Sequence, residues 1–512
     1  MNAYKIRINV DIVPTTDSPT VSPVRADDGW VEVVIPETEA SSIDRCDRPL
    51  LETSHPVLRD ALSRHLSALS KKKALRRGPE EMIVEKAYPY WVDGEVGRFE
   101  FTPHEVCDGE RTLYDTASEV FPPRGRGEWD KTSGFKEVAY IYGVTEASYR
   151  KTSRWLNRLR HQSESDGTPA RSLQAQAEGE GARLWEGLDR KASQMLAAAH
   201  VSEQDGSLRV PEVFPPPQPL TMPPDRVDAA IATCQQRLKS PQNLRLNPVP
   251  YEAPEVTVNL SVDEVGVKRQ KADRGSSTSP SPSSSAATGA KSRKYAHTTV
   301  VHLEQQQRTY VLVGHGMGRV FRLVVAFLLS NGLGTFHLQF FTDGYGVLHE
   351  AIRRSVSWCA NVVIVLDWYH LLTKCQVQLS LALTGREPRN AVLKEILPLL
   401  WHGLGDQAIL SLNSLDPRLI KQPEALTKLI GYFERNRAHI PCYAVRKELG
   451  LRNSSQIGEK MNDVLVSQRQ KHNGMSWSVA GSVGLAALAA LGRNNEYAQW
   501  FDEGEIAFQF AA

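Results

Sequence analysis

Two short apolar runs that each stop close to an aspartate constrain the fold of this chain more than any other feature. Residues 338–341 (LQFF) and 362–366 (VVIVL) have the length of buried strands, and Asp343 and Asp367 follow them. The segment between the runs has the length and composition of a helix. A strand, a helix and a second strand in succession favour parallel pairing with a right-handed crossover. Both aspartates are therefore predicted at the same, carboxyl, edge of a sheet.

Three further strands are predicted ahead of this unit. In residues 256–263 (VTVNLSVD) apolar residues alternate with polar ones, which places Asp263 on the polar face of a strand. Residues 295–304 (YAHTTVVHLE) and 307–316 (QRTYVLVGHG) predict two more strands joined by a short turn. The three strands together indicate an antiparallel meander, and a helix at 319–329 leads from it to the first parallel strand.

Acids at the carboxyl edge of such a sheet suggest a ligand site. Open sheets with parallel strands bind their ligands at this edge. Three antiparallel strands followed by parallel strands with acids at the rim is the order of a ribonuclease-H-like fold, so the predicted class is α/β with a mixed sheet. Carboxylates there suit Mg²⁺, and two ions about 4 Å apart can activate an attacking oxygen and stabilise a leaving one.

The third acid is predicted on a downstream helix. Glu459 and Asp463 share one side of residues 456–465, with Ser454 or Ser455 as the cap. We prefer Glu459 over the other candidates, which are Glu350 in the crossover helix, Glu395, Glu434 and Asp463. The basic continuation offers Arg469 and Lys471 as contacts for DNA phosphates, with a solvated helix face as the alternative.

Four motifs in this order carry a family resemblance. They are SVDEVGVK (261–268), FTDGYG (341–346), LDWYHLL (366–372) and IGEKMNDVLVSQRQKHNGMSWS (457–478). They resemble bacterial insertion-sequence DDE transposases of the ISKra type, within the wider set that has a C/D-x-x-H motif after the second acid. GTPARSLQ (167–174) and the helices before it are also similar, so the resemblance covers most of the chain from about residue 85.

The resemblance implies a role for each matched residue. Asp263, Asp343 and Glu459 match the catalytic, metal-binding acids, and Asp367 with His370 matches the supporting D-x-x-H. The structural alternatives are a solvent-facing strand acid, a turn-forming Asp-Gly, and a helix-capping acid beside a packed histidine. The Ser-rich segment 271–294 departs from the family.

The activity implied is that of a DNA transposase. Such an enzyme cleaves DNA at the element ends with Mg²⁺, as two ions for which Mn²⁺ can substitute, and transfers the freed strand into target DNA. The implied partners are double-stranded DNA, as terminal inverted repeats and target, and further copies of the chain on that DNA. The alternatives are an inactive, transposase-derived DNA-binding protein and a nuclease that cuts without joining.

Residues 133–162 predict a helix-turn-helix that contacts DNA. Val138, Ile141 and Tyr142 fit one helical face, Gly143 provides a break, and Thr145 can cap a second helix. That helix carries five cations suited to phosphates and groove edges, with the solvated face of a structural hairpin as the alternative: Arg150, Lys151, Arg154, Arg158 and Arg160.

The 512 residues indicate several domains. We predict an N-terminal α+β module (1–120), a helix-turn-helix and helical DNA-binding region (121–210), a Pro-rich linker with one helix (211–254) and a catalytic domain (255–512). The catalytic domain is expected to contain a disordered loop at 271–294 and a helical insertion at about 385–450.

Composition excludes several classes of protein. Six scattered cysteines without a C-x-x-C pair argue against a zinc ribbon and a secreted disulfide scaffold. The N-terminus does not have the pattern of a signal peptide, and the longest apolar stretches are shorter than a membrane span. A cytoplasmic, nucleoid-associated bacterial protein without membrane contact is the expectation. A net charge of +2 requires any basic surface to be local.

Overall fold

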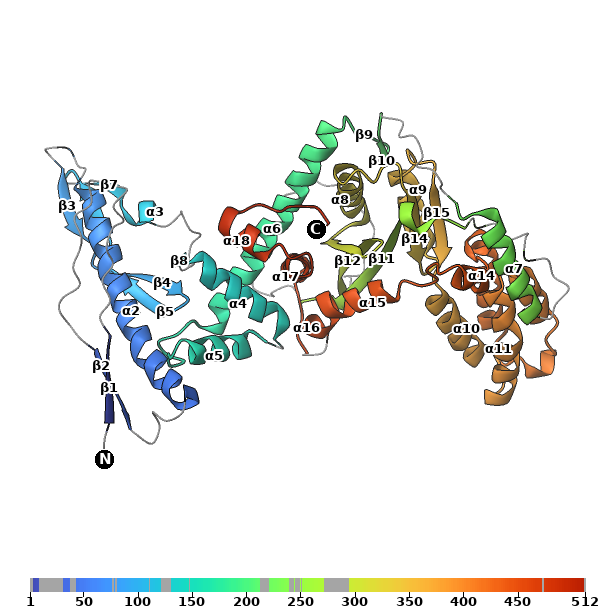
Figure 1. The fold of residues 1–512 in the computed structure, drawn as a ribbon, viewed down its shortest axis with the longest axis horizontal. Coiled ribbons are helices and arrows are strands. Elements are labelled where there is room, and N and C mark those ends of the chain that lie inside the picture. Colours follow the sequence, from blue (N-terminus) through green and yellow to red (C-terminus); the bar gives the residue numbers. More distant parts are fainter. Residues whose placement is uncertain are drawn as a thin grey trace, which may run out of the picture. The chain divides into compact units, whose positions relative to one another are not determined.

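The computed structural model divides the chain into two compact units (Figure 1). The first holds Met1–Glu180 and Tyr497–Glu505, and the second holds Gly181–Glu496 and Ile506–Ala512. The described residues are 3–8, 31–36, 43–75, 78, 81–109, 111–120, 130–146, 148–211, 221–238, 244, 249, 251–270, 294–471 and 474–510.

Two predicted segments lie outside the described residues. They are the proline run at 212–220 and the Ser-rich segment at 271–293, so the linker and the disordered loop stay predictions. The predicted domain boundaries also stay predictions, since the division between the units falls inside helix α6 (Ala170–Ala198). Among the described helices, none has both the length and the apolar content needed to cross a membrane.

The first unit begins as a small α+β module. Helix α2 (Ile43–Ala74) packs against β5, and Val92, Phe99 and Phe101 are buried beside it. The described strands of this module form three small sheets. The first pairs β1 (Ala3–Ile8) with β2 (Val31–Pro36). The second has the order β3 (Met82–Glu85), β6 (His104–Cys107), β7 (Thr112–Asp115), and the third has the order β5 (Gly97–Phe101), β4 (Tyr90–Gly94), β8 (Asp130–Lys131).

The predicted helix pair is present, but its cap differs. Helix α4 (Ser133–Thr145) ends on the residue that we expected to cap the next helix. Helix α5 (Tyr149–Leu159) is capped instead by Ser148, whose hydroxyl accepts a hydrogen bond from Lys151 N at 3.3 Å. The predicted cap at Thr145 was therefore wrong by three residues.

The buried face of α4 also differs from the predicted one. Tyr140 is buried against Phe501 of α18 (Tyr497–Glu503), with ring centroids 5.6 Å apart, whereas Tyr142 is exposed. This partner lies 361 residues away in the sequence (501 − 140). Helical periodicity indicates which residues share a face but not which face meets a distant segment.

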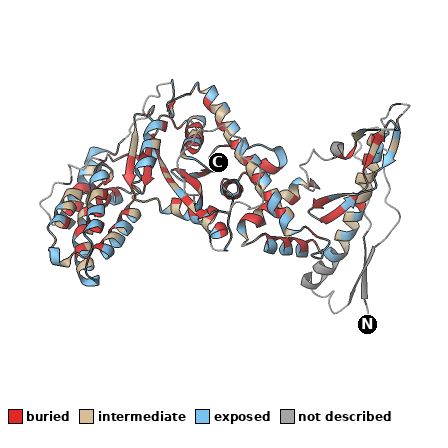
Figure 2. Cartoon of the chain, turned by 180° about the vertical axis from the view of Figure 1, so that it is seen from behind, coloured by how far each residue is buried: buried red, intermediate tan, exposed pale blue. Residues whose placement is uncertain are grey.

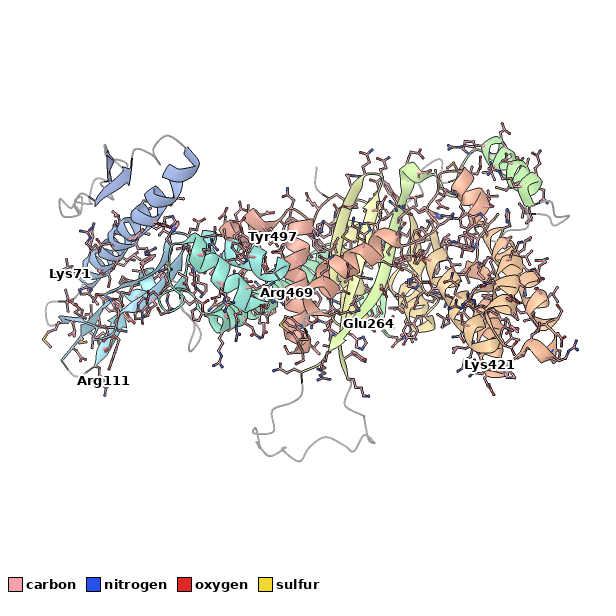
Figure 3. The ribbon with its side chains drawn as sticks, turned by 90° about the horizontal axis from the view of Figure 1, so that it is seen from below. Lys71, Arg111, Glu264, Lys421, Arg469 and Tyr497 are labelled. Carbon is pink, nitrogen blue, oxygen red and sulfur yellow. The ribbon has the colours of Figure 1, made fainter. Side chains whose placement is uncertain are left out.

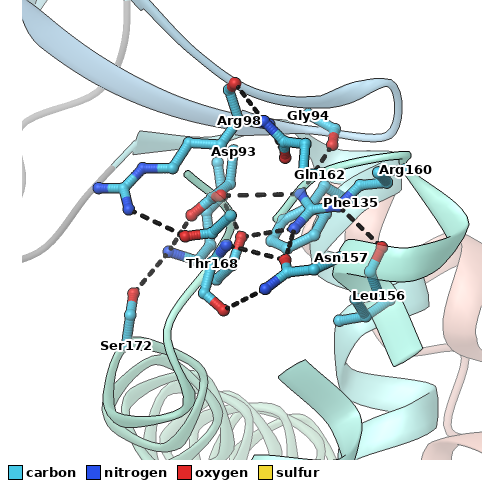
Figure 4. Close-up of polar contacts among 12 residues, drawn as sticks. Asp93, Gly94, Arg98, Phe135, Leu156, Asn157, Arg160, Gln162, Thr168 and Ser172 are labelled. Carbon is cyan, nitrogen blue, oxygen red and sulfur yellow. Dashed lines mark hydrogen bonds and ion pairs between the residues drawn. The ribbon is translucent and has the colours of Figure 1, made fainter. Parts of the chain in front are cut away.

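A buried ionic network joins β4, β8 and the end of α5 (Figure 4). The Asp93 carboxylate lies 3.3 Å from Lys131 Nζ and 3.7 Å from Arg160 Nη1. It also accepts a short hydrogen bond from the Thr168 hydroxyl, and Arg160 Nη2 donates to the same hydroxyl at 2.7 Å. Burial lowers the pKa of Arg160 to about 10, which Asp93 opposes. The network ties the helix pair to the N-terminal strands.

A five-stranded mixed sheet lies in the second unit, in the order β13-β12-β11-β14-β15. Strand β12 pairs antiparallel with β11 and β13, whereas β14 runs parallel to β11 and β15. The antiparallel meander and the parallel pairing of β14 with β15 were predicted from the sequence, whereas the pairing of β11 with β14 is a finding of the structure. The strands are β11 (Thr257–Lys268), β12 (Tyr295–Gln305), β13 (Arg308–Gly314), β14 (His337–Thr342) and β15 (Val362–Leu366).

Helices surround this sheet and fill the predicted insertion. Next to the strands are α8 (Met317–Ser330), α9 (Gly346–Ser355), α15 (Gln456–Asn462), a π-helical turn (Asp463–Ser467), α16 (Gln468–Gln470) and α17 (Val479–Arg493). Beyond β15 are α10 (Trp368–Ala382), α11 (Arg386–Trp401), α12 (Gly405–Asn413), α13 (Pro423–Arg435) and α14 (Tyr443–Glu448), with α7 (Pro224–Leu238) packed on α14.

The two faces of the sheet are covered by different helices. Tyr310 of β13 stacks on Phe327 of α8, with ring centroids 4.4 Å apart. Tyr310 pairs with Leu303 of β12, so both face the side of α8. Thr298 lies five residues before Leu303 in the same strand and therefore faces the opposite side of the sheet. Thr298 meets α17, where its hydroxyl lies 3.0 Å from that of Ser482. The sheet is thus buried on both faces at these strands (Figure 2).

Candidate active site

Asp263 lies in β11 on the face that α17 covers. Its partner in β12 is Val300, two residues after Thr298, so both face the same side. The next residue, Glu264, alternates to the opposite side, is exposed, and lies 3.3 Å from His297 Nδ1 (Figure 3). The predicted polar position of Asp263 is therefore a half-buried one beneath a helix.

Asp343 follows β14 directly and lies on the same side. Phe341 pairs with Ser261 in the parallel strand, so Asp343, two residues further, shares the face of Asp263. Its Oδ1 accepts a hydrogen bond from Tyr345 N at 2.8 Å, which is the turn typical of Asp-Gly. The turn and the position at the sheet edge are thus compatible.

The helical insertion holds this turn in place. Gly344 has a φ of +84°, and a Cβ there would lie 2.8 Å from the Asn436 amide of the insertion. The Tyr432 hydroxyl of α13 donates to the Asp343 carbonyl oxygen at 2.8 Å. Only glycine fits this backbone and this approach, so the insertion contributes to the position of Asp343.

Glu459 reaches the site because α15 approaches the sheet closely. At Gly458 a Cβ would lie only 2.6 Å from the Cβ of Ser261, so a larger residue would push the helix away. Asp463, the other acid predicted on this side, starts the π-helical turn. It is exposed and accepts a hydrogen bond from Gln468 Nε2 at 3.0 Å. The π turn changes the helical phase, and Asp463 does not line the pocket.

Both residues of the D-x-x-H motif contact the helix of Glu459. Asp367 is fully buried and caps α10 by accepting from the N–H groups of Tyr369 and His370 at 2.7 and 2.9 Å. Its other oxygen accepts from the backbone N–H of Ser455, and from the Ser455 hydroxyl at 2.8 Å. His370 Nε2 lies 3.1 Å from Glu459 Oε1. Ser455, one of the two predicted caps, is the N-cap residue of α15, but its side chain makes no capping hydrogen bond to the helix.

Replacing Asp367 by Asn should lower the free energy of unfolding by about 1–3 kcal/mol. The amide has one acceptor oxygen and would turn an NH₂ group toward a donor that is now satisfied. Urea unfolding followed by circular dichroism measures the loss. Asp416→Asn is the matched control, because Asp416 also caps a helical turn but its side chain is 38% exposed; equal midpoints for the two variants would contradict the structural role of Asp367.

The three candidate acids line one pocket with His302 and His370. Its volume is about 10 Å³, room for about one water molecule or ion. Burial raises the pKa of Glu459, and the charges of Asp367 and Asp263 act in the same direction while His370 opposes them. Another negative charge is therefore disfavoured here, whereas a cation would be stabilised.

The chemistry of these carboxylates fits a divalent cation, but their side chains do not meet at one point. Three carboxylates are the hard oxygen ligands that Mg²⁺ prefers. Within the described part of the chain, however, no group of three or more His, Cys, Asp or Glu side chains is close enough to hold a metal ion. The acids line the same pocket without converging on one point.

Two pocket residues were missed from the sequence. His302 is buried in β12 opposite Ser261, and burial lowers its pKa to about 4, so it is neutral near pH 7. Asn462 is 7% exposed, and its Nδ2 donates to Asp263 Oδ2 at 2.5 Å. The period of the strand could have placed His302 on this face; nothing local in the sequence indicates Asn462.

The predicted DNA contacts divide into exposed and buried residues. On α5, Arg150, Lys151, Arg154 and Arg158 are exposed, and Arg154 Nε pairs with Glu164 at 2.9 Å. Arg160, the fifth cation of the predicted set, is 3% exposed and belongs to the Asp93 network, so that prediction was wrong.

The second predicted set also contains one buried residue. Lys471 is exposed, but Arg469 is 2% exposed, with its guanidinium 5.3 Å from the ring centroid of Trp477 (Figure 3). A DNA contact by Arg469 does not fit this position, because its charge packs on an aromatic ring instead of facing solvent. Lys471 stays a candidate for phosphate binding.

No family model matches the chain, and no curated protein sequence matches it. A search of solved structures finds a weak likeness to the Mos1 transposase paired-end complex with left transposon end. The identity is 10% and the TM-score 0.15, over 66% of this chain and 99% of that chain. So low a score supports neither a common fold nor a common function.

Proposed function

We propose that the second unit is a ribonuclease-H-like catalytic domain and that the chain is a DDE-type DNA transposase. The observation that carries this is the pocket lined by Asp263 of β11, Asp343 after β14 and Glu459 of α15. The strand order, with an antiparallel meander followed by two parallel strands, agrees with that fold.

Asp263, Asp343 and Glu459 would hold Mg²⁺ in this proposal. Bound cations would polarise the scissile phosphate and activate the attacking oxygen. In the first step water oxygen bonds to phosphorus, the bond to the 3′ oxygen breaks, and that oxygen takes up a proton. In the second step the freed 3′-hydroxyl gives up its proton as its oxygen bonds to the phosphorus of a target phosphodiester, the bond from that phosphorus to the target 3′ oxygen breaks, and the displaced oxygen takes up a proton. Asp367 and His370 keep the helix of Glu459 against the sheet.

A cell-free assay tests the proposal against its alternatives. The purified chain is incubated with a supercoiled plasmid that carries the DNA flanking its gene, with Mg²⁺ or with EDTA. Mg²⁺-dependent nicks followed by strand-transfer joints are expected. Nicks without joints would identify a nuclease that only cuts. Retention of the flanking DNA without any cleavage would identify a DNA-binding protein and contradict the catalytic proposal.

Removing two cations from α5 should weaken DNA binding and its salt dependence. Each phosphate that the protein no longer neutralises lowers the slope of log K against log salt by about 0.9, so Arg154→Ala with Arg158→Ala should lower it by about 1.8. Fluorescence anisotropy of a labelled duplex at several salt concentrations measures this. Arg111→Ala, an exposed cation of the same unit, is the control; an unchanged slope in the double variant would exclude phosphate contacts by Arg154 and Arg158.

A further inference from the structure

Asn462 is bonded to one of the candidate acids and has an oxygen left over. It follows Glu459 by three residues at the end of α15 and lines the same pocket. Its Nδ2 donates to Asp263 Oδ2 at 2.5 Å, while its Oδ1 is buried and makes no hydrogen bond among the described residues. Most buried polar atoms in proteins have a partner, and the position of Asn462 in the pocket leaves this acceptor available to a group bound there.

The orientation of this amide follows from its neighbour. A carboxylate can only accept hydrogen bonds, so the NH₂ group of Asn462 must face Asp263 and the oxygen must face the other way. An amide flip would set two acceptors against each other. The position of Oδ1 is therefore determined by the charge of Asp263.

The amide oxygen of Asn462 would add a further oxygen ligand to the carboxylates of the pocket. The described His, Cys, Asp and Glu side chains form no group of three that could hold a metal ion, although three carboxylates line the pocket. Asn462 lines the same pocket and offers an oxygen from another residue type beside these carboxylates. Asparagine oxygens are regular ligands of hard divalent cations.

We infer that Asn462 is a positioning residue for Asp263 and that its Oδ1 is a further oxygen donor for a divalent cation. This inference rests on the proposed function, because the cation is the one that the acids would hold. The NH₂ group of the amide would hold the Asp263 carboxylate in position, and the amide oxygen would bind the cation. The π-helical turn that begins at Asp463 ends the regular helix directly after Asn462.

Mn²⁺ binding to the full chain without DNA tests the inference. Electron paramagnetic resonance measures free Mn²⁺ during a titration. Asn462→Ala should weaken binding by about 10-fold or more, the usual effect of losing a partner of a metal site. Asn462→Asp should bind Mn²⁺ at least as tightly as the wild type, because it keeps an oxygen donor and adds charge. Without metal, its carboxylate beside Asp263 should lower the melting temperature, and Mn²⁺ should restore it.

Asn453→Ala is the matched control. Asn453 also has a buried Oδ1 without a hydrogen-bond partner among the described residues, and its Nδ2 donates to Tyr443 O at 2.7 Å, but it does not line the pocket. If Asn462→Ala binds Mn²⁺ as tightly as Asn453→Ala while Asp343→Asn weakens binding, the inference is overturned and the proposed function stands. A wild-type chain that does not bind Mn²⁺ overturns both.

Discussion

Replacing Asp343 by Asn should reduce Mg²⁺-dependent DNA cleavage by at least about 10³-fold. Loss of a metal ligand removes several kcal/mol of transition-state stabilisation, and about 4 kcal/mol corresponds to that factor. The fold should survive, since an asparagine keeps the Oδ1 that accepts from Tyr345 N at 2.8 Å and tolerates the same turn. Single-turnover cleavage of a plasmid carrying the flanking DNA measures the effect, with the melting temperature as the check on folding.

Glu350→Gln provides the matched control for Asp343. Glu350 is an exposed acid of the adjoining helix α9 and pairs with Arg354 Nε at 2.7 Å, outside the pocket. Its replacement should leave cleavage within about twofold, because an exposed i,i+4 pair contributes only about 0.3–0.5 kcal/mol. Cleavage by Asp343→Asn at the control rate would remove Asp343 from the catalytic set.

The sheet could be predicted because its rules are local and periodic. Alternation in β11 gives the face of Asp263, and a strand-helix-strand sequence gives the parallel pair β14 and β15. Because Phe341 pairs with Ser261 and each aspartate lies two residues after one member of this pair, Asp343 and Asp263 face the same side of the sheet. The two acids that end β14 and β15 nevertheless have different environments: Asp343 is exposed at the pocket, whereas Asp367 is fully buried as a cap.

The buried cations could not be predicted, because their partners are distant in sequence. Charged residues on a helix are usually solvated, so Arg160 and Arg469 were assigned to DNA. Arg160 instead donates to Gly94 O at 3.2 Å and pairs with Asp93, while Arg469 packs on Trp477. The helical pattern predicts that both side chains are solvated, but each is instead buried against residues distant in the sequence.

Asn462 shows a second limit of periodic reasoning. The i, i+4 rule paired Glu459 with Asp463, but a π-helical turn begins there and Asp463 is exposed. The residue at i+3 contacts Asp263 instead. No Pro or Gly lies within this turn, so nothing local in the sequence indicates the change of helical phase.

Replacing Asp93 by Asn should destabilise the first unit by about 3–5 kcal/mol. Lys131 and Arg160 are buried against the Asp93 carboxylate, and burial lowers the pKa of both, which Asp93 opposes. The asparagine side chain would carry no charge, so both buried cations would lose the carboxylate that neutralises them. Breaking a buried ion pair by removing one partner typically costs about 3–5 kcal/mol of stability. Urea unfolding followed by tryptophan fluorescence should then show an earlier transition than in the wild type.

Asp60→Asn separates this effect from the loss of any ion pair. Asp60 pairs with Arg64 on the exposed side of α2, so its replacement should shift the midpoint little. Because Arg160 ends α5, unfolding of the network should also abolish DNA binding by that helix, whereas Mn²⁺ binding in the second unit should persist. If Asp93→Asn unfolded at the same urea concentration as Asp60→Asn, the network would not be what holds α5 to the N-terminal strands.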